Sequence, residues 1–376
     1  MMPLSGRTTP IGWRPVLTDV WYVGSRVSAA GRDGHLLRPA VGDRHATLFV
    51  SADPGFVGSG PTMTLPPELH HLDLGDVVIV AADGTRVDVA WKQGATHNSV
   101  LLTERCDNYC LMCSQPPKAR DDSYLYDRAK RVISAIPRGA RALALTGGEP
   151  TIARDAFLDL LQHCAAVAPD LAVHVLSNGR SFADRAFARR LAGVPLNDVM
   201  VGIPLYAAEP RLHDFVVQAS GAFDETVRGI CNLVEADVRV EIRVVLQAQS
   251  VPVLGEIARF IARNLPFVEQ VALMGLEMTG LARPNSALVW SDPVDYAAEL
   301  REAYTILRDS GICTSIYNLQ LCVLDRELWP AAVRSISDWK NDFPELCAPC
   351  GVRDVCGGVF TTSGNRLSRG LAPVTV

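Results

Sequence analysis

Three cysteines lie close together in the segment 104–113, at a Cys-x3-Cys-x2-Cys spacing: Cys106, Cys110 and Cys113. Three thiolates on one short loop can ligate three irons of a 4Fe-4S cluster and leave the fourth iron without a protein ligand. A small molecule can then bind that fourth iron. The spacing therefore predicts a cluster that does chemistry on a bound molecule as well as carrying electrons.

A second group of cysteines lies further along the chain, with Cys347, Cys350 and Cys356 close together and Cys322 upstream as a candidate fourth member. Four thiols suit either a tetrahedral zinc ion or a second iron-sulfur cluster, and their spacing does not separate the two. Without Cys322 the site would have three thiols and an open position. The other three cysteines stand apart and are expected to be small buried hydrophobic residues: Cys164, Cys231 and Cys313.

The composition is that of an ordinary globular protein, with 376 residues, 48% of them hydrophobic and 20% charged. A formal net charge of -5 gives no reason to expect nucleic acid as a partner. The first twenty residues lack the apolar run of a signal peptide, and no later run is long and apolar enough for a membrane helix. Because the cysteines are grouped at metal-ligand spacing, we expect a reducing compartment and hence a cytoplasmic protein.

The middle of the chain alternates β-branched runs with amphipathic stretches of helical period, the pattern of repeated βα units. Because such crossovers are right-handed, six units in succession predict an α/β fold, a partial (β/α)6 TIM-like barrel with functional loops at the C-terminal ends of its strands. Strands are expected over residues 99–103, 141–146, 171–176, 198–203, 238–246 and 268–274. Helices are expected over residues 123–136, 154–167, 182–191, 223–235, 253–264 and 292–310.

The two ends of the chain lack the βα alternation of this middle part. Residues 1–95 contain short strand candidates at 48–51, 77–81 and 87–91, with an Asp-Gly hairpin turn between the last two, and predict a small β-rich N-terminal domain. Residues 96–316 are expected to form the barrel. Residues 317–376 are irregular, with a short helix expected around 331–338, and carry the second cysteine group.

A glycine-rich segment, Gly147-Gly148-Glu149, follows the second expected strand. Two glycines there let the backbone approach a ligand closely and offer its amides and carbonyls, while Glu149 can accept a hydrogen bond or cap the next helix. Taken alone, the segment is equally well explained as a simple turn. About thirty-five residues after the three-cysteine loop, it favours a ligand site.

Together these two motifs resemble the radical S-adenosylmethionine (SAM) superfamily, over about residues 99–280. That superfamily pairs a three-cysteine loop after its first strand with a Gly-Gly-Glu segment after its second. The resemblance implies that Cys106, Cys110 and Cys113 ligate a 4Fe-4S cluster whose free iron chelates SAM. It also implies that Gly147, Gly148 and Glu149 hold the methionyl amine, and that reductive cleavage of SAM gives a 5'-deoxyadenosyl radical that removes a substrate hydrogen.

Three further residues are candidates for SAM binding by the same resemblance. Ser177 and Asn178 end the third strand at the same rim, although an Asn-Gly turn explains them equally well. Arg243 lies inside the fifth strand, where a charge must be paired; the SAM carboxylate is one candidate partner and a structural ion pair is the other. Two departures are visible, because Met112 replaces a common aromatic residue and Pro204 replaces a serine that would bind ribose.

Longer stretches resemble one subgroup, the His-Xaa-Ser system radical SAM maturases of the C type. The similar segments are residues 101–104, 110–118, 176–180, 202–206, 271–280, 335–340 and 350–356. In this subgroup the C-terminal cysteines are expected to bind an auxiliary cluster, here a second 4Fe-4S cluster at Cys322, Cys347, Cys350 and Cys356.

The subgroup resemblance implies modification of a ribosomally made precursor peptide with His-Xaa-Ser repeats. An electron donor, a second radical SAM protein and a small partner protein are the expected partners. Crosslinking, oxidation and sulfur insertion all stay open as reactions, and no catalytic residue is assigned. Two other functions also stay open: radical chemistry on a small molecule, and a zinc-stabilised peptide-binding protein without catalysis.

Overall fold

The structure is a computed structural model that describes most of the chain. The residues that it does not describe are 1–4, 12–18, 24–32, 38–46, 52–61, 65, 70, 82, 335–340, 365 and 376. Two large sheets occupy separate parts of the sequence, β1 to β8 and β9 to β16. No helix within the described residues is long and apolar enough to cross a membrane.

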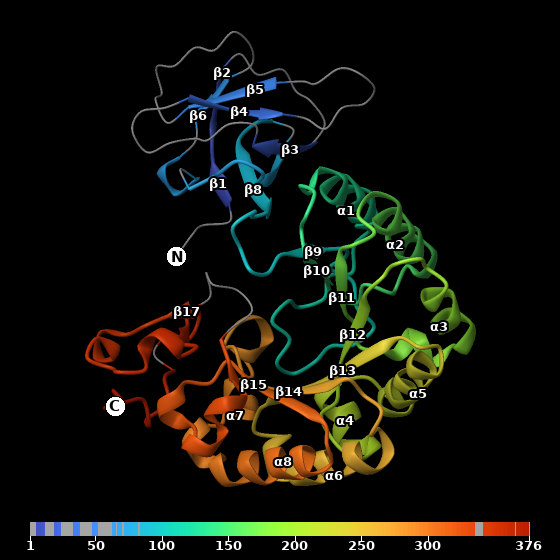
Figure 1. The fold of residues 1–376 in the computed structure, drawn as a ribbon, viewed down its shortest axis with the longest axis vertical. Coiled ribbons are helices and arrows are strands. Elements are labelled where there is room, and N and C mark those ends of the chain that lie inside the picture. The colour runs from blue at the N-terminus through green and yellow to red at the C-terminus, as the bar shows by residue number, and fades with distance from the viewer. Residues whose placement is uncertain are drawn as a thin grey trace.

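The larger unit is an eight-stranded sheet in which each strand pairs in parallel with the next one along the chain. Since successive strands are also neighbours, the sheet curls in one direction into an open barrel (Figure 1). Its strands are β9 (Ser99–Leu101), β10 (Ala142–Thr146), β11 (Ala172–Leu176), β12 (Val199–Pro204), β13 (Arg239–Leu246), β14 (Gln270–Gly275), β15 (Cys313–Tyr317) and β16 (Ala332–Val333). The α/β partial barrel expected from the sequence is therefore confirmed.

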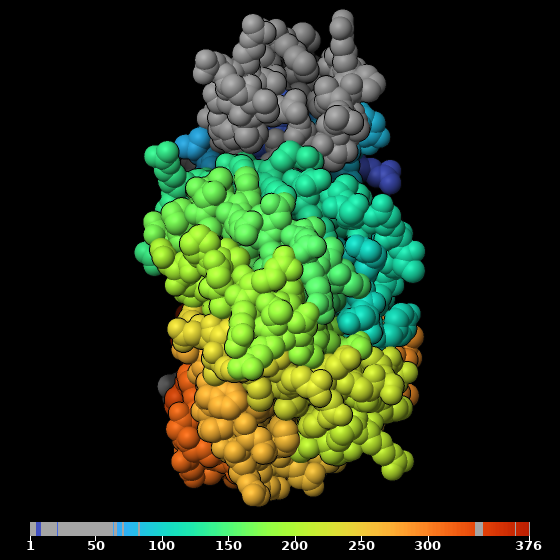
Figure 2. Space-filling model, turned by 90° about the vertical axis from the view of Figure 1, so that its right-hand side faces the viewer, coloured from blue at the N-terminus to red at the C-terminus, as the bar shows by residue number. Residues whose placement is uncertain are grey.

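Helices between the strands cover the convex side of the barrel, and Figure 2 shows the continuous outer surface that they form, coloured green to yellow. Their inward faces are apolar because hydrophobic residues recur at helical spacing, and they join the strands in one large core. The helices are α1 (Tyr124–Ala135), α2 (Arg154–Val167), α3 (Arg185–Ala192), α4 (Pro210–Val217), α5 (Ala222–Glu235), α6 (Leu254–Asn264), α7 (Ser286–Val289) and α8 (Ala297–Asp309).

Several expected elements differ from those found. The sheet has two strands more than the six expected, because β15 and β16 extend it. The helix expected over 182–191 is broken at Asp184, whose side chain caps α3 by accepting the amides of Ala186 and Phe187. The helix expected from 292 begins only at Ala297, after a 3-10 turn.

The C-terminal region also corrects two expectations. The helix expected over 331–338 is wrong at its start, where Ala332 and Val333 pair with β15 as a strand, and its later part lies outside the described residues, as does the similar segment 335–340. Cys164 is buried as expected, but Cys231 and Cys313 are exposed. Cys231 lies on α5, which buries only one face, and Cys313 is the first residue of β15.

The N-terminal part contains a second eight-stranded sheet, mostly antiparallel, at the top of Figure 1. The expected hairpin is present between β7 and β8, with Gly84 at a φ of 70° in its turn. Two short strands near the C-terminus pair separately, β17 (Asn341–Asp342) and β18 (Val359–Phe360). The N-terminal strands are β1 (Ser5–Arg7), β2 (Thr9–Ile11), β3 (Asp19–Val23), β4 (Asp33–Leu37), β5 (Thr47–Ser51), β6 (Thr62–Thr64), β7 (Val77–Val80) and β8 (Arg86–Trp91).

Candidate functional site

The three-cysteine loop follows β9 at the C-terminal rim of the barrel, and its thiols lie partly buried near one another. Burial raises the pKa of the Cys106 thiol to about 12 and also raises the pKa of Cys110 and Cys113. The neighbouring thiols raise the pKa of Cys110 further. Three thiolates are therefore costly here on their own, whereas a cationic metal cluster would stabilise them. The donor set fits the expected cluster.

A buried carboxylate fixes the start of this loop. Asp122 is fully buried and accepts hydrogen bonds from the hydroxyl of Thr103 at 2.9 Å and from Nε of Arg105 at 3.2 Å. It also accepts the backbone amide of Glu104. These three donors hold the chain where it leaves β9 and turns into the loop.

A second set of contacts joins the loop to the end of β11. Arg180 donates from Nη1 to the carbonyl of Asp107 and to Oδ1 of Asn108, both at 2.8 Å, and from Nε to Glu225 on α5 at 2.6 Å. Nδ2 of Asn178 donates to Oδ1 of Asp107 at 2.6 Å. The residues between Cys106 and Cys110 are thus tied to two other elements.

The Gly-Gly-Glu segment runs directly alongside the loop. The amide of Gly148 donates to the carbonyl of Thr103, and the amide of Glu149 to that of Arg105, both at 2.8 Å. A Cβ at position 147 would lie 2.5 Å from the Thr103 carbonyl oxygen, and one at 148 would overlap that of Arg105. Both glycines are therefore needed for this close approach.

The side chain of Glu149 points into the protein and is fully buried. Its carboxylate accepts hydrogen bonds from the hydroxyl of Ser177 at 2.8 Å, the amide of Asn178 at 2.6 Å, and the amide and hydroxyl of Thr151 at 2.9 and 2.6 Å. The structure thus brings the two predicted segments, 147–149 and 177–178, together beside the cysteine loop. The carboxylate of Glu149 and the hydroxyl of Ser177 are engaged with each other, and the Glu149 carbonyl accepts the amide of Ile152 at 3.1 Å, so the backbone carbonyls of Gly147 and Gly148 are the groups left for a ligand.

Arg243 projects from β13 into a small polar network. Its Nη1 donates to Oε1 of Glu241 at 2.7 Å, and Oε2 of Glu241 accepts a hydrogen bond from the side-chain amide of Gln270. Nε2 of His174 lies 3.7 Å from the same carboxylate and has no hydrogen-bond partner among the described residues. The structural ion pair considered for Arg243 is therefore present, and its binding of SAM stays a prediction.

The second cysteine group surrounds a small cavity, which is lined by Cys322, Cys347, Cys350 and Cys356 together with Phe343 and Leu371. Backbone amides donate to the sulfurs: those of Leu321 and Gly358 to Cys356, both at 3.5 Å, that of Val374 to Cys350 at 3.4 Å, and that of Ala372 to Cys322. Cys322 therefore lies with the other three thiols. Hydrogen bonds of this kind accompany cysteine ligands of iron-sulfur clusters, so the site fits such a group. No three His, Cys, Asp or Glu side chains within the described part of the chain converge closely enough to hold one metal ion.

Residues 100–259 match the family model of the Radical SAM superfamily. This part of the chain is a radical SAM domain. The matched residues run from the strand before the cysteine loop to α6, so they contain both segments that meet beside the three thiols.

Curated relatives share this domain at low identity. The chain is 29% identical to the GTP 3',8-cyclase of Actinobacillus succinogenes over 161 residues, which are 42% of this chain and 46% of that protein. It is 28% identical to the Fe-coproporphyrin III synthase of Methanosarcina barkeri over 154 residues, 40% of this chain and 37% of that protein. The match thus spans less than half the length of either relative.

Among solved structures, a radical SAM methyltransferase from Sphaerobacter thermophilus superposes with a TM-score of 0.47 at 18% identity, covering 67% of this chain and 81% of that one. A likeness at this level says nothing about substrate. The radical SAM assignment thus comes from residues 100–259 and the geometry of their two motifs.

Sequence reasoning missed the residues that hold the radical SAM site in place. Asp122 and Arg180 carry no motif of their own, although Arg180 directly follows the Ser177-Asn178-Gly179 turn at the rim. Their partners lie 17 to 73 residues away along the chain, a separation that no local pattern reveals.

Proposed function

We propose that this chain is a radical SAM enzyme of peptide maturation. When bound, a 4Fe-4S cluster at Cys106, Cys110 and Cys113 supplies the electron that cleaves SAM reductively into methionine and a 5'-deoxyadenosyl radical, which abstracts a substrate hydrogen. The observation that carries this proposal is the contact between the cysteine loop and Gly147–Glu149, made by two backbone hydrogen bonds within the radical SAM domain.

The chain's own residues bind and shield the cofactors in this proposal. The backbone carbonyls of Gly147 and Gly148 accept the methionyl amine, since the side chain and carbonyl of Glu149 and the amides of Gly148 and Glu149 are already engaged. Asn178 orients the loop through Asp107, and Arg243 supplies a cation toward the SAM carboxylate. An apolar cluster that includes Leu111, Met112, Tyr206 and Met278 packs around the loop and excludes water from it.

A second 4Fe-4S cluster at Cys322, Cys347, Cys350 and Cys356 is part of the proposal. The cavity between the four thiols and the amides directed at three of them support it over an isolated zinc ion, which needs four sulfurs at about 2.3 Å from one point. All ten cysteines are free thiols, which supports work in the reducing cytoplasm.

The proposed substrate is a ribosomally made precursor peptide with His-Xaa-Ser repeats. The sequence stretches similar to the His-Xaa-Ser maturases and the second thiol group support this substrate. An electron donor, a second radical SAM protein and a small partner protein complete the proposed system. Crosslinking, oxidation and sulfur insertion are each compatible with two clusters.

A small-molecule substrate is the second candidate, because the curated relatives that share the radical SAM domain are named for a nucleotide and a porphyrin. This candidate predicts that the purified protein turns over such a compound without any peptide. Incubation with GTP, SAM and a reductant tests it directly by mass spectrometry.

The decisive experiment is anaerobic purification and reconstitution, followed by metal analysis and reduction in the presence of SAM. Formation of 5'-deoxyadenosine is expected, with about eight irons per chain for two clusters. Bound zinc without 5'-deoxyadenosine would instead show a metal-stabilised binding protein. Co-expression with a His-Xaa-Ser peptide, followed by mass spectrometry of that peptide, tests the substrate.

A further inference from the structure

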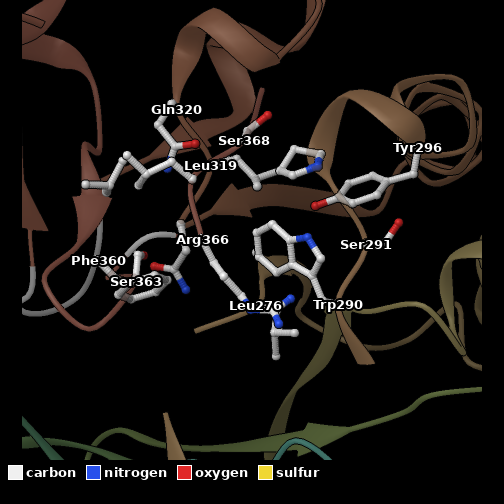
Figure 3. A pocket seen from close by; sticks show the side chains of 15 residues that line it. Leu276, Trp290, Ser291, Tyr296, Leu319, Gln320, Phe360, Ser363, Arg366 and Ser368 are labelled. Carbon is white, nitrogen blue, oxygen red and sulfur yellow. The ribbon is translucent and has the colours of Figure 1, made fainter. Parts of the chain in front are cut away.

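A small cavity, open on one side, lies between the C-terminal ends of β14 and β15 and the last part of the chain. No feature of the radical SAM domain assigns a function to it. Figure 3 shows Trp290 and Tyr296 on one side of this cavity and Phe360 and Ser363 on the other. Arg366 passes between them, with its guanidinium group beside Leu276 and Trp290.

Several polar groups that face this cavity make no hydrogen bond to a described residue. Tyr296 is 2% exposed, its hydroxyl points toward the cavity, and it makes no hydrogen bond to any described residue (Figure 3). The same is true, within the described residues, for the indole N–H of Trp290 and the hydroxyls of Ser291 and Ser363. A hydroxyl at the wall of a cavity can donate its hydrogen bond to a bound ligand.

The charge of the cavity is positive. Arg366 is its one cationic side chain among the described lining residues, and no aspartate or glutamate is found among them. Arg366 is exposed and donates from Nη2 to the hydroxyl of Ser286 at 3.0 Å, which orients the guanidinium; its other side-chain N–H groups make no hydrogen bond to a described residue. The nearby Asp292 is already engaged by Ser368 at 2.5 Å and by the amide of Arg369 at 3.0 Å. Donors converge here, and their natural partner is an anion with planar oxygen acceptors.

The cavity also lies between the two cysteine sites. Gln320 and Val359 line both this cavity and the one enclosed by the second cysteine group. On the other side, the segment that follows β14 lines the cavity at its start, with Leu276, and again at Trp290. Between these two residues it contacts the three-cysteine loop, where the amide of Leu281 donates to the carbonyl of Cys113 at 2.8 Å. A group bound in this cavity is therefore held beside the path from one cysteine site to the other.

We propose that this cavity binds a carboxylate of the peptide substrate, with Arg366 and Tyr296 as the recognising residues. The inference rests on the proposed peptide substrate and adds its anchoring chemistry. A side-chain carboxylate and a C-terminal carboxylate present the same group, so both sources are compared in the test.

The test measures binding to the anaerobically purified full-length protein by saturation-transfer NMR titration. One pair of probes is N-acetyl-glutamic acid α-amide and N-acetyl-glutamine α-amide; the other is N-acetyl-alanine and its amide. For at least one pair, the acid is expected to bind tenfold or more tightly than the amide, in keeping with charge-assisted hydrogen bonds. The pair that shows the preference identifies the source of the carboxylate.

Variants of the lining residues test whether the preference for the acid arises from binding in this cavity. Arg366→Gln should remove the preference for the acid, Arg366→Lys should retain part of it, and Tyr296→Phe should weaken binding several-fold without loss of fold. The matched control Arg308→Gln, on the surface end of α8, should leave the preference unchanged. Equal binding of acid and amide, or an undiminished preference in Arg366→Gln, would overturn the inference.

Failure of this inference is distinguishable from failure of the proposed function. The binding assay needs neither SAM nor a reductant, whereas 5'-deoxyadenosine formation needs no occupant of this cavity. Wild-type protein that forms 5'-deoxyadenosine but shows no acid preference refutes the cavity alone. An acid preference without 5'-deoxyadenosine refutes the radical enzyme and leaves an anion-binding cavity.

Discussion

The two cysteine sites of this protein are held in place in different ways. Around the first, side chains and backbone groups of the barrel hold the loop itself, through Asp122, Arg180 and the amides of Gly148 and Glu149. Two backbone amides are directed at sulfurs there: that of Asn108 at Cys106, at 3.4 Å, and that of Gln115 at Cys113. Around the second, four backbone amides are directed at the sulfurs of three cysteines.

Under the proposed function, this difference corresponds to two tasks, SAM cleavage at the first site and electron transfer at the second. A site whose chemistry occurs at an open iron needs a loop of fixed shape with space on one side, and rigid outer contacts provide that. A site that only holds and passes electrons benefits from amides at its sulfurs, because they stabilise the added negative charge of the reduced cluster. The contrast therefore predicts that changes at the first site affect SAM cleavage and that changes at the second affect iron content and potential.

The largest expected effect comes from removing one thiol at each site. Cys110→Ala should lose about four irons per chain and reduce 5'-deoxyadenosine formation to background, because the loop then holds the cluster with two ligands. Cys350→Ala should also lose about four irons but retain SAM cleavage in the absence of peptide. Iron analysis and quantification of 5'-deoxyadenosine on both variants measure this.

The exposed Cys231 offers a matched control, since Cys231→Ala removes a thiol from α5 outside both sites. That variant should keep full iron content and activity. Loss of SAM cleavage in Cys350→Ala equal to that in Cys110→Ala would contradict the division of tasks.

The next prediction concerns the pH dependence of folding stability, through a histidine on the helix that contacts the first site. Burial lowers the pKa of His213 from 6.5 to about 4. The ring of His213 packs against Tyr206. His213 lies on α4, and the last two residues of this helix contact the three-cysteine loop: the carbonyl of Val216 accepts the amide of Leu111, and that of Val217 accepts the amide of Tyr109. Because the unfolded chain binds a proton near pH 6.5 while the folded chain does not, stability is full above that pH and falls toward pH 4.

The loss amounts to about 3 kcal/mol in the free energy of unfolding between pH 7 and pH 4. Denaturant unfolding at several pH values measures it. His213→Gln should flatten this dependence, whereas the same change at the exposed His97 should leave it as in the wild type. An equally steep dependence in His213→Gln would show that other groups are responsible.

How much of the fold and of the candidate site could be predicted from the sequence depends on how far apart in the chain the interacting residues lie. The six βα units, the cysteine spacings and the Gly-Gly-Glu segment are local patterns, and the structure places them as expected. The hydrogen bond from Ser177 to Glu149 and the contacts of Arg180 and Arg366 join residues that are distant in sequence. Those contacts depend on how the strands align, which periodicity does not encode.

A smaller effect is expected from Arg180, which ties the first loop to β11 and α5. Arg180→Gln removes three hydrogen bonds to the loop and to Glu225, at a cost of about 2 kcal/mol. Iron should leave the first site roughly thirtyfold faster under a chelator, while the second site keeps its iron. Arg190→Gln, at an exposed ion pair on α3, is the control and should behave as the wild type.

The smallest effect should appear at the second site, where the amide of Val374 donates to the sulfur of Cys350 at 3.4 Å. Val374→Pro removes this donor, whereas Val374→Ala shortens the side chain and keeps it. Since the amide stabilises the reduced cluster, its loss should lower the midpoint potential of the second cluster by roughly 50 mV, and the alanine variant should not change it. Redox titration followed by electron paramagnetic resonance resolves the two clusters. A shift in the potential of the first cluster, or an equal shift in both variants, would show that Val374 affects the potential through side-chain packing and not through its amide.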